Sequence, residues 1–134
     1  MGIIAAFIIV LPFMLPYLSI PITERAGYFP RHLLLPLLVF ALLGNFLEEV
    51  LFRGLLQTQL QKVTTAFRAI LLSGLFFALG HTFLAITVTD LGYMVLVFTL
   101  SEGLICAWLA DRFGLIPASL AHALAIFMLS AGVI

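Results

Sequence analysis

The stretch that decides the fold is HLLLPLLVFALLGNFLEEVLFRGLLQTQLQ, residues 32–61. No acidic residue, lysine or arginine occurs in it before Glu48, and Glu49 and Arg53 then follow closely. An apolar run of this kind predicts a membrane-crossing helix, because about 20 apolar residues span the hydrocarbon core of a bilayer. At about 1.5 Å per residue, the whole stretch exceeds a core of about 30 Å, so we expect it to tilt or to emerge beyond Arg53.

The composition of the whole chain agrees with a membrane protein. The 134 residues are 64% hydrophobic and 9% charged, and the mean hydropathy is +1.29. Soluble globular domains carry about 25% charged residues, so that class is excluded. The sequence predicts an all-α, polytopic transmembrane helix bundle of about five spans, surrounded by membrane lipid. The formal net charge is +0 and no basic run occurs, which argues against nucleic acid as a partner.

Four further apolar segments complete the predicted bundle. We divide the chain into a kinked N-terminal helix and loop, residues 1–31, and a helical core, residues 32–134. The first span is expected to be retained, since it lacks the basic leader and cleavage site of a secretory signal. A short polar connection is predicted from Lys62 to Arg68. The four spans are predicted at about Gly2–Ile20, Ala69–Val88, Leu91–Ala110 and Pro117 to the C-terminus.

Five spans would place alternate loops on opposite sides of the membrane. One side then carries Lys62, Arg68 and Arg112, and the other carries Arg25 and Arg31. The positive-inside rule predicts a cytosolic N-terminus, and we expect the protein in the plasma membrane.

Ionisable side chains at bilayer depth are candidate functional groups, because each costs about 2.5–3.5 kcal/mol to insert. Glu49 and Arg53 are four residues apart, in the acid-before-base order that favours pairing on one helix face. Glu48 lies about 100° round the helix from Glu49 and is free to bind a water or a proton. The alternative is that these charges mark the membrane surface, where they cost little.

Two histidines fall in separate predicted spans, His81 in the third and His122 in the fifth. A single histidine in a membrane helix is often a satisfied core residue. Two of them, with Glu48 and Glu49 on another helix, would form a cluster able to activate water or hold a metal. Asn45, one turn before the glutamates, is a candidate supporting residue.

The fourth span carries further polar and small residues. Glu102 is expected to hydrogen-bond across helices, and Gly103 with Ala107 would let a neighbouring helix approach closely. Cys106 is the only cysteine, which excludes an internal disulfide and predicts a small buried side chain.

Residues 48–53 fit the pattern EExxxR, residues 77–81 fit FxxxH, and His122 begins a third element, HALAI. In this order and spacing, they resemble the motifs of the CAAX prenyl protease and bacteriocin-processing family of intramembrane proteases, also called CPBP or Abi. The resemblance covers about residues 32–134. It departs at Ile126, where the family has Asn or Asp.

The resemblance implies an intramembrane endopeptidase, similar to type II CAAX prenyl endopeptidases, that works without a covalent intermediate. Glu48 would act as general base on a water that His81 positions, and His122 would donate to the developing oxyanion. Glu49 and Arg53 would support these groups. The substrate would be a peptide or protein, such as a prenylated tail, a bacteriocin leader or a membrane-protein segment.

The residues require no cofactor. A divalent metal such as zinc is an alternative to unassisted water activation, and Glu48, His81 and His122 would then be its ligands.

Two other functions remain open. Because Ile126 cannot donate a hydrogen bond, the chain could be a catalytically weak or inactive relative that binds a peptide or an immunity partner. It could also be a fragment of a proton-coupled carrier with Glu48, His81 and Glu102 as a relay, although no inverted repeat is evident.

Overall fold

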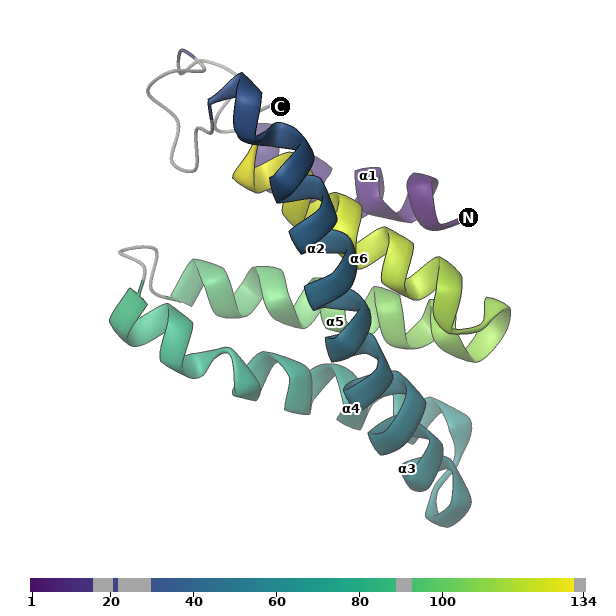
Figure 1. The fold of residues 1–134 in the computed structure, drawn as a ribbon. Coiled ribbons are helices and arrows are strands. Elements are labelled where there is room, and N and C mark those ends of the chain that lie inside the picture. Colours follow the sequence, from purple (N-terminus) through teal and green to yellow (C-terminus); the bar gives the residue numbers. More distant parts are fainter. Residues whose placement is uncertain (16–20, 22–29, 89–92, 132–134) are drawn as a thin grey trace.

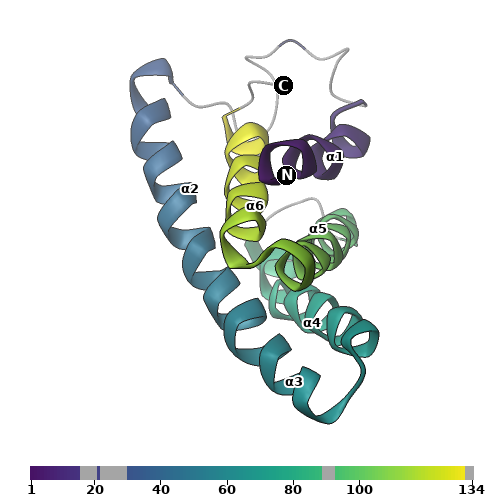
Figure 2. The same cartoon turned by 90° about the vertical axis from the view of Figure 1, so that its right-hand side faces the viewer.

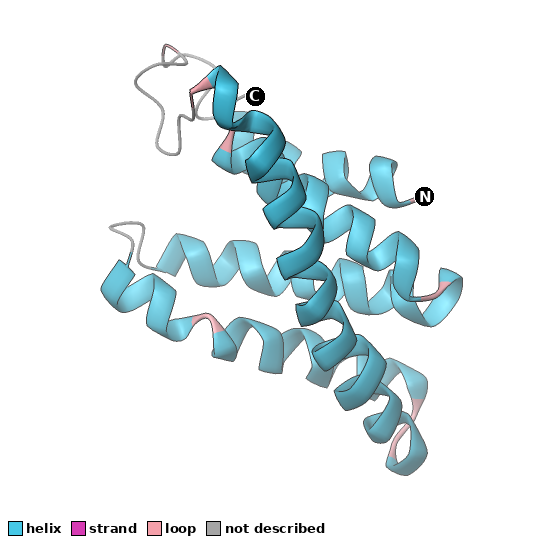
Figure 3. Cartoon of the chain, in the orientation of Figure 1, coloured by secondary structure: helices cyan, strands magenta, loops and turns pink. Residues whose placement is uncertain are grey.

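The computed structural model describes residues 1–15, 21, 30–88 and 93–131, and all regular structure in this part of the chain is helical (Figure 1, Figure 3). Three segments are long and apolar enough to cross a membrane, Arg31–Val63, Ala66–Thr87 and Tyr93–Phe113, and two shorter apolar helices accompany them. The protein is therefore an all-α bundle of about five spans, as its composition predicts. The elements are α1 (Gly2–Met14), η3 (Arg31–Leu33), α2 (Leu34–Glu49), η4 (Val50–Gln57), α3 (Thr58–Val63), α4 (Ala66–Gly80), η5 (Leu84–Val88), α5 (Tyr93–Phe113) and α6 (Leu115–Ser130).

The stretch quoted first forms part of one continuous helix of 33 residues, made of η3, α2, η4 and α3. It crosses the α4–α5 pair in Figure 1 and runs along one side of the bundle in Figure 2. Its η4 segment, VLFRGLLQ, is π-helical. π-Helical turns are rare and are found frequently at functional sites. Here the wider turns begin directly after Glu49 and include Arg53.

The connection from α3 to α4 is shorter than predicted. Only Thr64 and Thr65 join the two helices, instead of a polar connection from Lys62 to Arg68. The Thr65 hydroxyl accepts a hydrogen bond from the backbone N–H of Arg68 at 3.3 Å. This N-cap lets α4 begin before the predicted start, because it satisfies an amide in the first turn.

The junction of α5 and α6 lies at Gly114, so α6 begins at Leu115, before the predicted start at Pro117. Gly114 has a φ of 89°, in the region that favours glycine, and it separates the two helices. Pro117 lies in the first turn of α6, where its missing N–H is tolerated. α5 continues to Phe113, beyond the predicted end at Ala110.

The N-terminus, the α3–α4 junction and the α5–α6 junction lie toward the same side of the bundle, on the right in Figure 1. Gln61 Nε2 donates to Asp111 Oδ1 at 2.8 Å, which joins α3 to the end of α5. Lys62, Arg68 and Arg112 therefore share one end, as the alternation of spans predicts. Arg25 lies outside the described residues, as do the predicted span limits at Ile20 and Leu91. The orientation across the membrane stays a prediction.

The main apolar core lies between α1, α5 and α6. Cys106 is fully buried in it, as predicted. Because α1 shares this core, it packs as part of the bundle, and the predicted division of the chain after residue 31 stays a prediction. Buried residues of this core are Ala5, Ala6, Ile9, Val10, Met14, Phe98, Cys106, Leu109, Ala118, Ala121, Ala125 and Met128.

α4 and α5 lie side by side and approach closely at two glycines (Figure 1, Figure 2). A Cβ on Gly103 would lie 3.0 Å from the Phe77 ring and 3.1 Å from the Gly74 carbonyl oxygen. Ala107, one turn later, is fully buried. The small-residue pair Gly103 and Ala107 thus permits the close packing predicted for it.

We expect Gly103→Ala to lower the free energy of unfolding by about 1–3 kcal/mol, the usual cost of overpacking. Unfolding in detergent can be followed by the fluorescence of Trp108, the single tryptophan. Gly54→Ala is the matched control, because a Cβ there meets only Val50 at 3.9 Å. Equal effects of the two substitutions would show that the contact at Gly103 does not limit helix packing.

Candidate active site

The structure separates the candidate residues into two groups. Glu48 and His81 form a partly exposed pair between α2 and the end of α4. Glu49, Arg53 and His122 form a buried group between α2, η4 and α6. The sequence predicts Glu48 close to both histidines, whereas each glutamate pairs with a different one.

Glu48 faces His81 across the helix interface. Glu48 Oε2 lies 3.7 Å from His81 Nε2, and the side chains are 41% and 17% exposed. This distance is longer than a direct hydrogen bond, but one water can contact both atoms. Glu48 Oε2 has no hydrogen-bond partner within the described residues.

The other ring nitrogen of His81 determines its tautomer. Nδ1 lies 2.8 Å from the Phe77 carbonyl oxygen, which can only accept, so Nδ1 carries the proton. In the neutral ring, Nε2 is then an acceptor. Two acceptors, Glu48 Oε2 and His81 Nε2, therefore point at the same space, and a water placed there can donate one hydrogen to each.

Glu49 and Arg53 form the pair predicted from their spacing. Arg53 Nη1 lies 2.9 Å from Glu49 Oε1, and both side chains are fully buried. His122 Nδ1 lies 2.9 Å from the same oxygen of Glu49. Arg53 also donates from Nη2 to the Gly103 carbonyl oxygen at 2.9 Å. These contacts join the long helix to both α5 and α6.

Glu102 approaches His122 from the opposite side. Its Oε2 lies 3.7 Å from His122 Nε2, and both residues are only 1% exposed. Glu102 thus contacts His122 across the helix interface, but the hydrogen bond predicted for it is not formed with any described residue, because 3.7 Å exceeds an ordinary hydrogen bond.

Phe77 has a role at the site that the sequence reasoning did not assign. Its buried ring lies 4.4 Å from the His81 ring and 5.3 Å from the His122 ring, measured between centroids. Arg53 Cζ lies 4.4 Å from its centroid, within cation–π range. Phe77 thus packs between the two groups and contacts both histidines. The FxxxH spacing was the available signal.

The sequence analysis also did not predict a ladder of hydrogen bonds, formed by successive side chains of η4 and α3 with α5. Gln57 Nε2 donates to the Ala107 carbonyl oxygen at 2.9 Å, one turn beyond the Arg53–Gly103 contact. Gln61 continues it with its bond to Asp111. The ladder fixes the long helix against α5 and so holds Arg53 in place.

A cavity of about 170 Å³ lies between α2 and α6 next to the first pair. Among the described residues, Glu48 is the only charged one that lines it, and Asn45 and Ile126 are also lining residues. Asn45 donates its amide to the Ala41 carbonyl oxygen at 2.8 Å, so its supporting role toward the glutamates stays a prediction. Ile126 presents an alkyl chain where an amide or carboxyl group was expected. The volume is sufficient for several waters.

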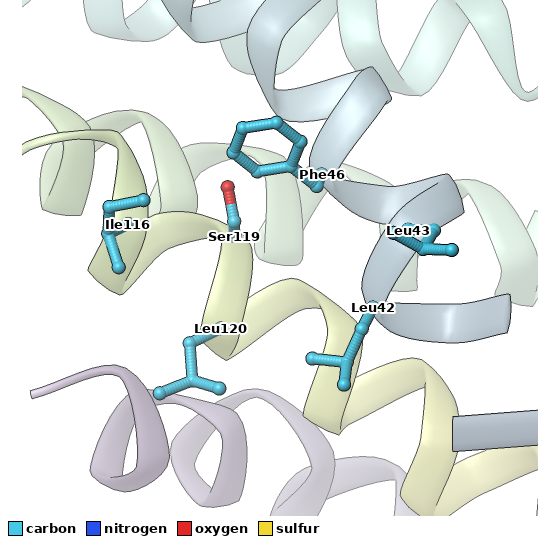
Figure 4. A pocket seen from close by; sticks show the side chains of 6 residues that line it. All are labelled: Leu42, Leu43, Phe46, Ile116, Ser119 and Leu120. Atoms are coloured by element: carbon cyan, nitrogen blue, oxygen red, sulfur yellow. The ribbon is translucent and has the colours of Figure 1, made fainter. Parts of the chain in front are cut away.

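A second hollow, of about 360 Å³, also lies between α2 and α6 (Figure 4). Of the described residues that line it, only Ser119 is polar, and its hydroxyl donates to the Leu115 carbonyl oxygen at 2.9 Å. Catalysis requires a free acid, base or nucleophile, so this hollow is not a candidate active site. Its lining residues are Leu42, Leu43, Phe46, Ile116, Ser119 and Leu120.

The predicted zinc ligands do not fit a metal in this arrangement. Within the part of the chain that the structure describes, no group of three or more His, Cys, Asp or Glu residues is placed to hold one. His122 turns Nδ1 to Glu49 and Nε2 to Glu102, rather than toward Glu48 and His81. We therefore derive no step through a metal, and metal dependence stays a prediction.

The fold and the site together define a multi-pass helical membrane protein with a glutamate–histidine pair beside a cavity in the bundle. A model of the family described as type II CAAX prenyl endopeptidase Rce1-like matches residues 30–128. The chain belongs to this family, which confirms the resemblance seen in the three motifs. Searches of curated proteins and of solved structures gave no match.

Proposed function

We propose that the protein is an intramembrane endopeptidase in which Glu48 and His81 activate a water for attack on a peptide bond. The family membership supports this function. The main structural support is that two hydrogen-bond acceptors, Glu48 Oε2 and His81 Nε2, face each other 3.7 Å apart. Such a pair binds a water through both of its hydrogens. The lone pairs of that water then point away from the pair.

The proposed step is general-base hydrolysis. As the water oxygen attacks the scissile carbonyl, Glu48 takes one of its protons, and His81 holds the other hydrogen. The proton on Glu48 is later transferred to the leaving amine, so the site returns to its starting state. His81 is aligned for this role because the Phe77 carbonyl oxygen fixes its Nδ1–H.

Charge on the carbonyl oxygen requires a donor in the transition state. We assign this role to His122, supported by Glu49 and Arg53 as in the prediction from the sequence. Ile126 supplies no donor, and Asn45 is the one side-chain amide among the described residues that line the cavity with Glu48. We therefore expect slow cleavage.

The proposed substrate is a peptide or protein segment that enters from the lipid, prenylated or not. The proposed setting is the plasma membrane with a cytosolic N-terminus, because the helix ends that carry Lys62, Arg68 and Arg112 lie on the same side of the bundle as the N-terminus (Figure 1).

Two observations favour a second candidate, a catalytically inactive member that binds a peptide or immunity partner. Ile126 removes an expected polar group from the cavity, and His122 is buried between two carboxyl groups. The same bundle would then hold a partner without cleaving it.

A cleavage assay with the reconstituted protein separates these functions. We expect cleavage of membrane-inserted peptides, and a loss of about 10- to 100-fold in His81→Ala, the range for one hydrogen bond to a charged group. The assay is run with and without a chelator, and we expect no chelator effect. Inhibition by chelator that added zinc reverses would restore the metal hypothesis. Peptide binding without cleavage by the unmodified protein would support the inactive member.

A further inference from the structure

Glu102 is a buried carboxyl group that none of the three motifs includes. It lies on α5, and neither of its oxygens has a hydrogen-bond partner in the described parts of the chain. Its contact across the helix interface is His122 Nε2 at 3.7 Å. Burial of a carboxyl group without a hydrogen-bond partner is costly. The position of Glu102 beside the His122 imidazole therefore requires a physical explanation.

The hydrogen bonds of His122 provide that reason. Nδ1 lies 2.9 Å from Glu49 Oε1, which is also paired with Arg53. A carboxylate paired with a guanidinium accepts hydrogen bonds, so Nδ1 carries a proton. In a neutral ring, Nε2 would then be an acceptor facing the carboxyl oxygen of Glu102. A proton between the two atoms removes this conflict.

We propose that Glu102 is a second positioning residue for His122, which keeps a proton on Nε2 while Glu49 holds Nδ1. The charges of the group balance: Arg53 offsets Glu49, and protonated His122 offsets Glu102. A net charge of zero reduces the cost of burying these four side chains together. Glu102 thereby maintains an N–H donor on the ring.

The separation of 3.7 Å has a chemical consequence. A tight hydrogen bond to Glu102 would compete for the Nε2–H, whereas a long contact leaves it able to donate to another acceptor. This part of the inference rests on the proposed function, in which that acceptor is the scissile carbonyl oxygen. The protonation of the ring does not depend on catalysis and can be measured without substrate.

The decisive measurement is the ¹⁵N NMR spectrum of histidine-labelled protein in micelles at neutral pH. The chain has 3 histidines, and His122→Gln identifies the signals of His122. We expect both ring nitrogens of His122 to be protonated in the unmodified protein, and Nε2 to lose its proton in Glu102→Gln. Ser101→Ala, at the neighbouring position, is the matched control and should leave the ring unchanged. An unprotonated Nε2 in the unmodified protein, or identical spectra in Glu102→Gln, would overturn the proposal.

Kinetics give the second readout. We expect Glu102→Gln to lower kcat about 10- to 100-fold with little change in KM, because one charge-assisted donor is lost while substrate binding persists. The thermal transition of Trp108 establishes that each variant is folded. If the NMR spectra show the expected protonation of His122 and its loss in Glu102→Gln, but the unmodified protein cleaves nothing, the positioning role stands and the proposed function fails. A fall in kcat with unchanged His122 spectra would instead refute the positioning role.

Discussion

Glu48→Gln is expected to lower the cleavage rate by about 10²- to 10⁴-fold, the contribution of a general base to catalysis. The amide keeps the size and shape of the side chain but cannot accept the proton of the attacking water. Glu48 is 41% exposed and holds no helix in place, so the unfolding temperature should change little. The rate is measured with a membrane-inserted peptide in liposomes, and unfolding is followed by Trp108 fluorescence.

Glu49→Gln is the matched comparison, since the two glutamates are adjacent and differ in surroundings. Glu49 is fully buried and contacts Arg53 and His122, each at 2.9 Å. Removing its charge leaves Arg53 without its counter-ion, which costs about 3–5 kcal/mol of stability. We therefore expect Glu48→Gln to lower activity with little effect on stability, and Glu49→Gln to lower stability. A Glu48→Gln variant that cleaves at the unmodified rate would refute the general-base role.

The fold class could be predicted because composition and local spacing determine it. A chain with 9% charged residues has lipid as its natural surroundings, and apolar runs of about 20 residues form helices there. The Glu49–Arg53 pair was predictable for a related reason. Contacts four residues apart are set by the geometry of a single helix.

The partners of the two histidines could not be predicted in the same way. Which glutamate meets His122 depends on the rotation and crossing of α6 against α2, and alanines line much of its buried face. Small side chains permit several such crossings, so packing of the whole bundle decides among them.

The π-helical segment was a second obstacle to prediction. No periodicity of the sequence indicated these wider turns, although the four-residue spacing of Arg53 and Gln57 places both on one helix face, which contacts α5. The start of α4 was misplaced for a simpler reason, because the capping ability of Thr65 was not considered.

Ile126→Asn is expected to raise the cleavage rate by about 10²- to 10³-fold, which is the usual contribution of one oxyanion donor. Ile126 lies one helical turn after His122 and lines the cavity that Glu48 also lines. An amide at this position would therefore stand on the same face of α6 as the proposed oxyanion donor and would line the cavity together with Glu48. The cavity, of about 170 Å³, leaves room for the polar group and its waters.

Two controls make the Ile126→Asn result specific. Ile126→Leu keeps an apolar side chain of equal size and supplies no donor, so its rate should match that of the unmodified protein. In the Glu48→Gln background, Ile126→Asn should give little gain, because a donor for the oxyanion cannot replace the base that activates the water. Equal turnover by Ile126→Asn and the unmodified protein would show that another group already stabilises the oxyanion. If Ile126→Asn binds peptide but neither it nor the unmodified protein cleaves, the inactive, partner-binding member becomes the better account. Substantial activation by Ile126→Asn would instead show that the site is a working hydrolase in which the alkyl chain at this one position limits the rate.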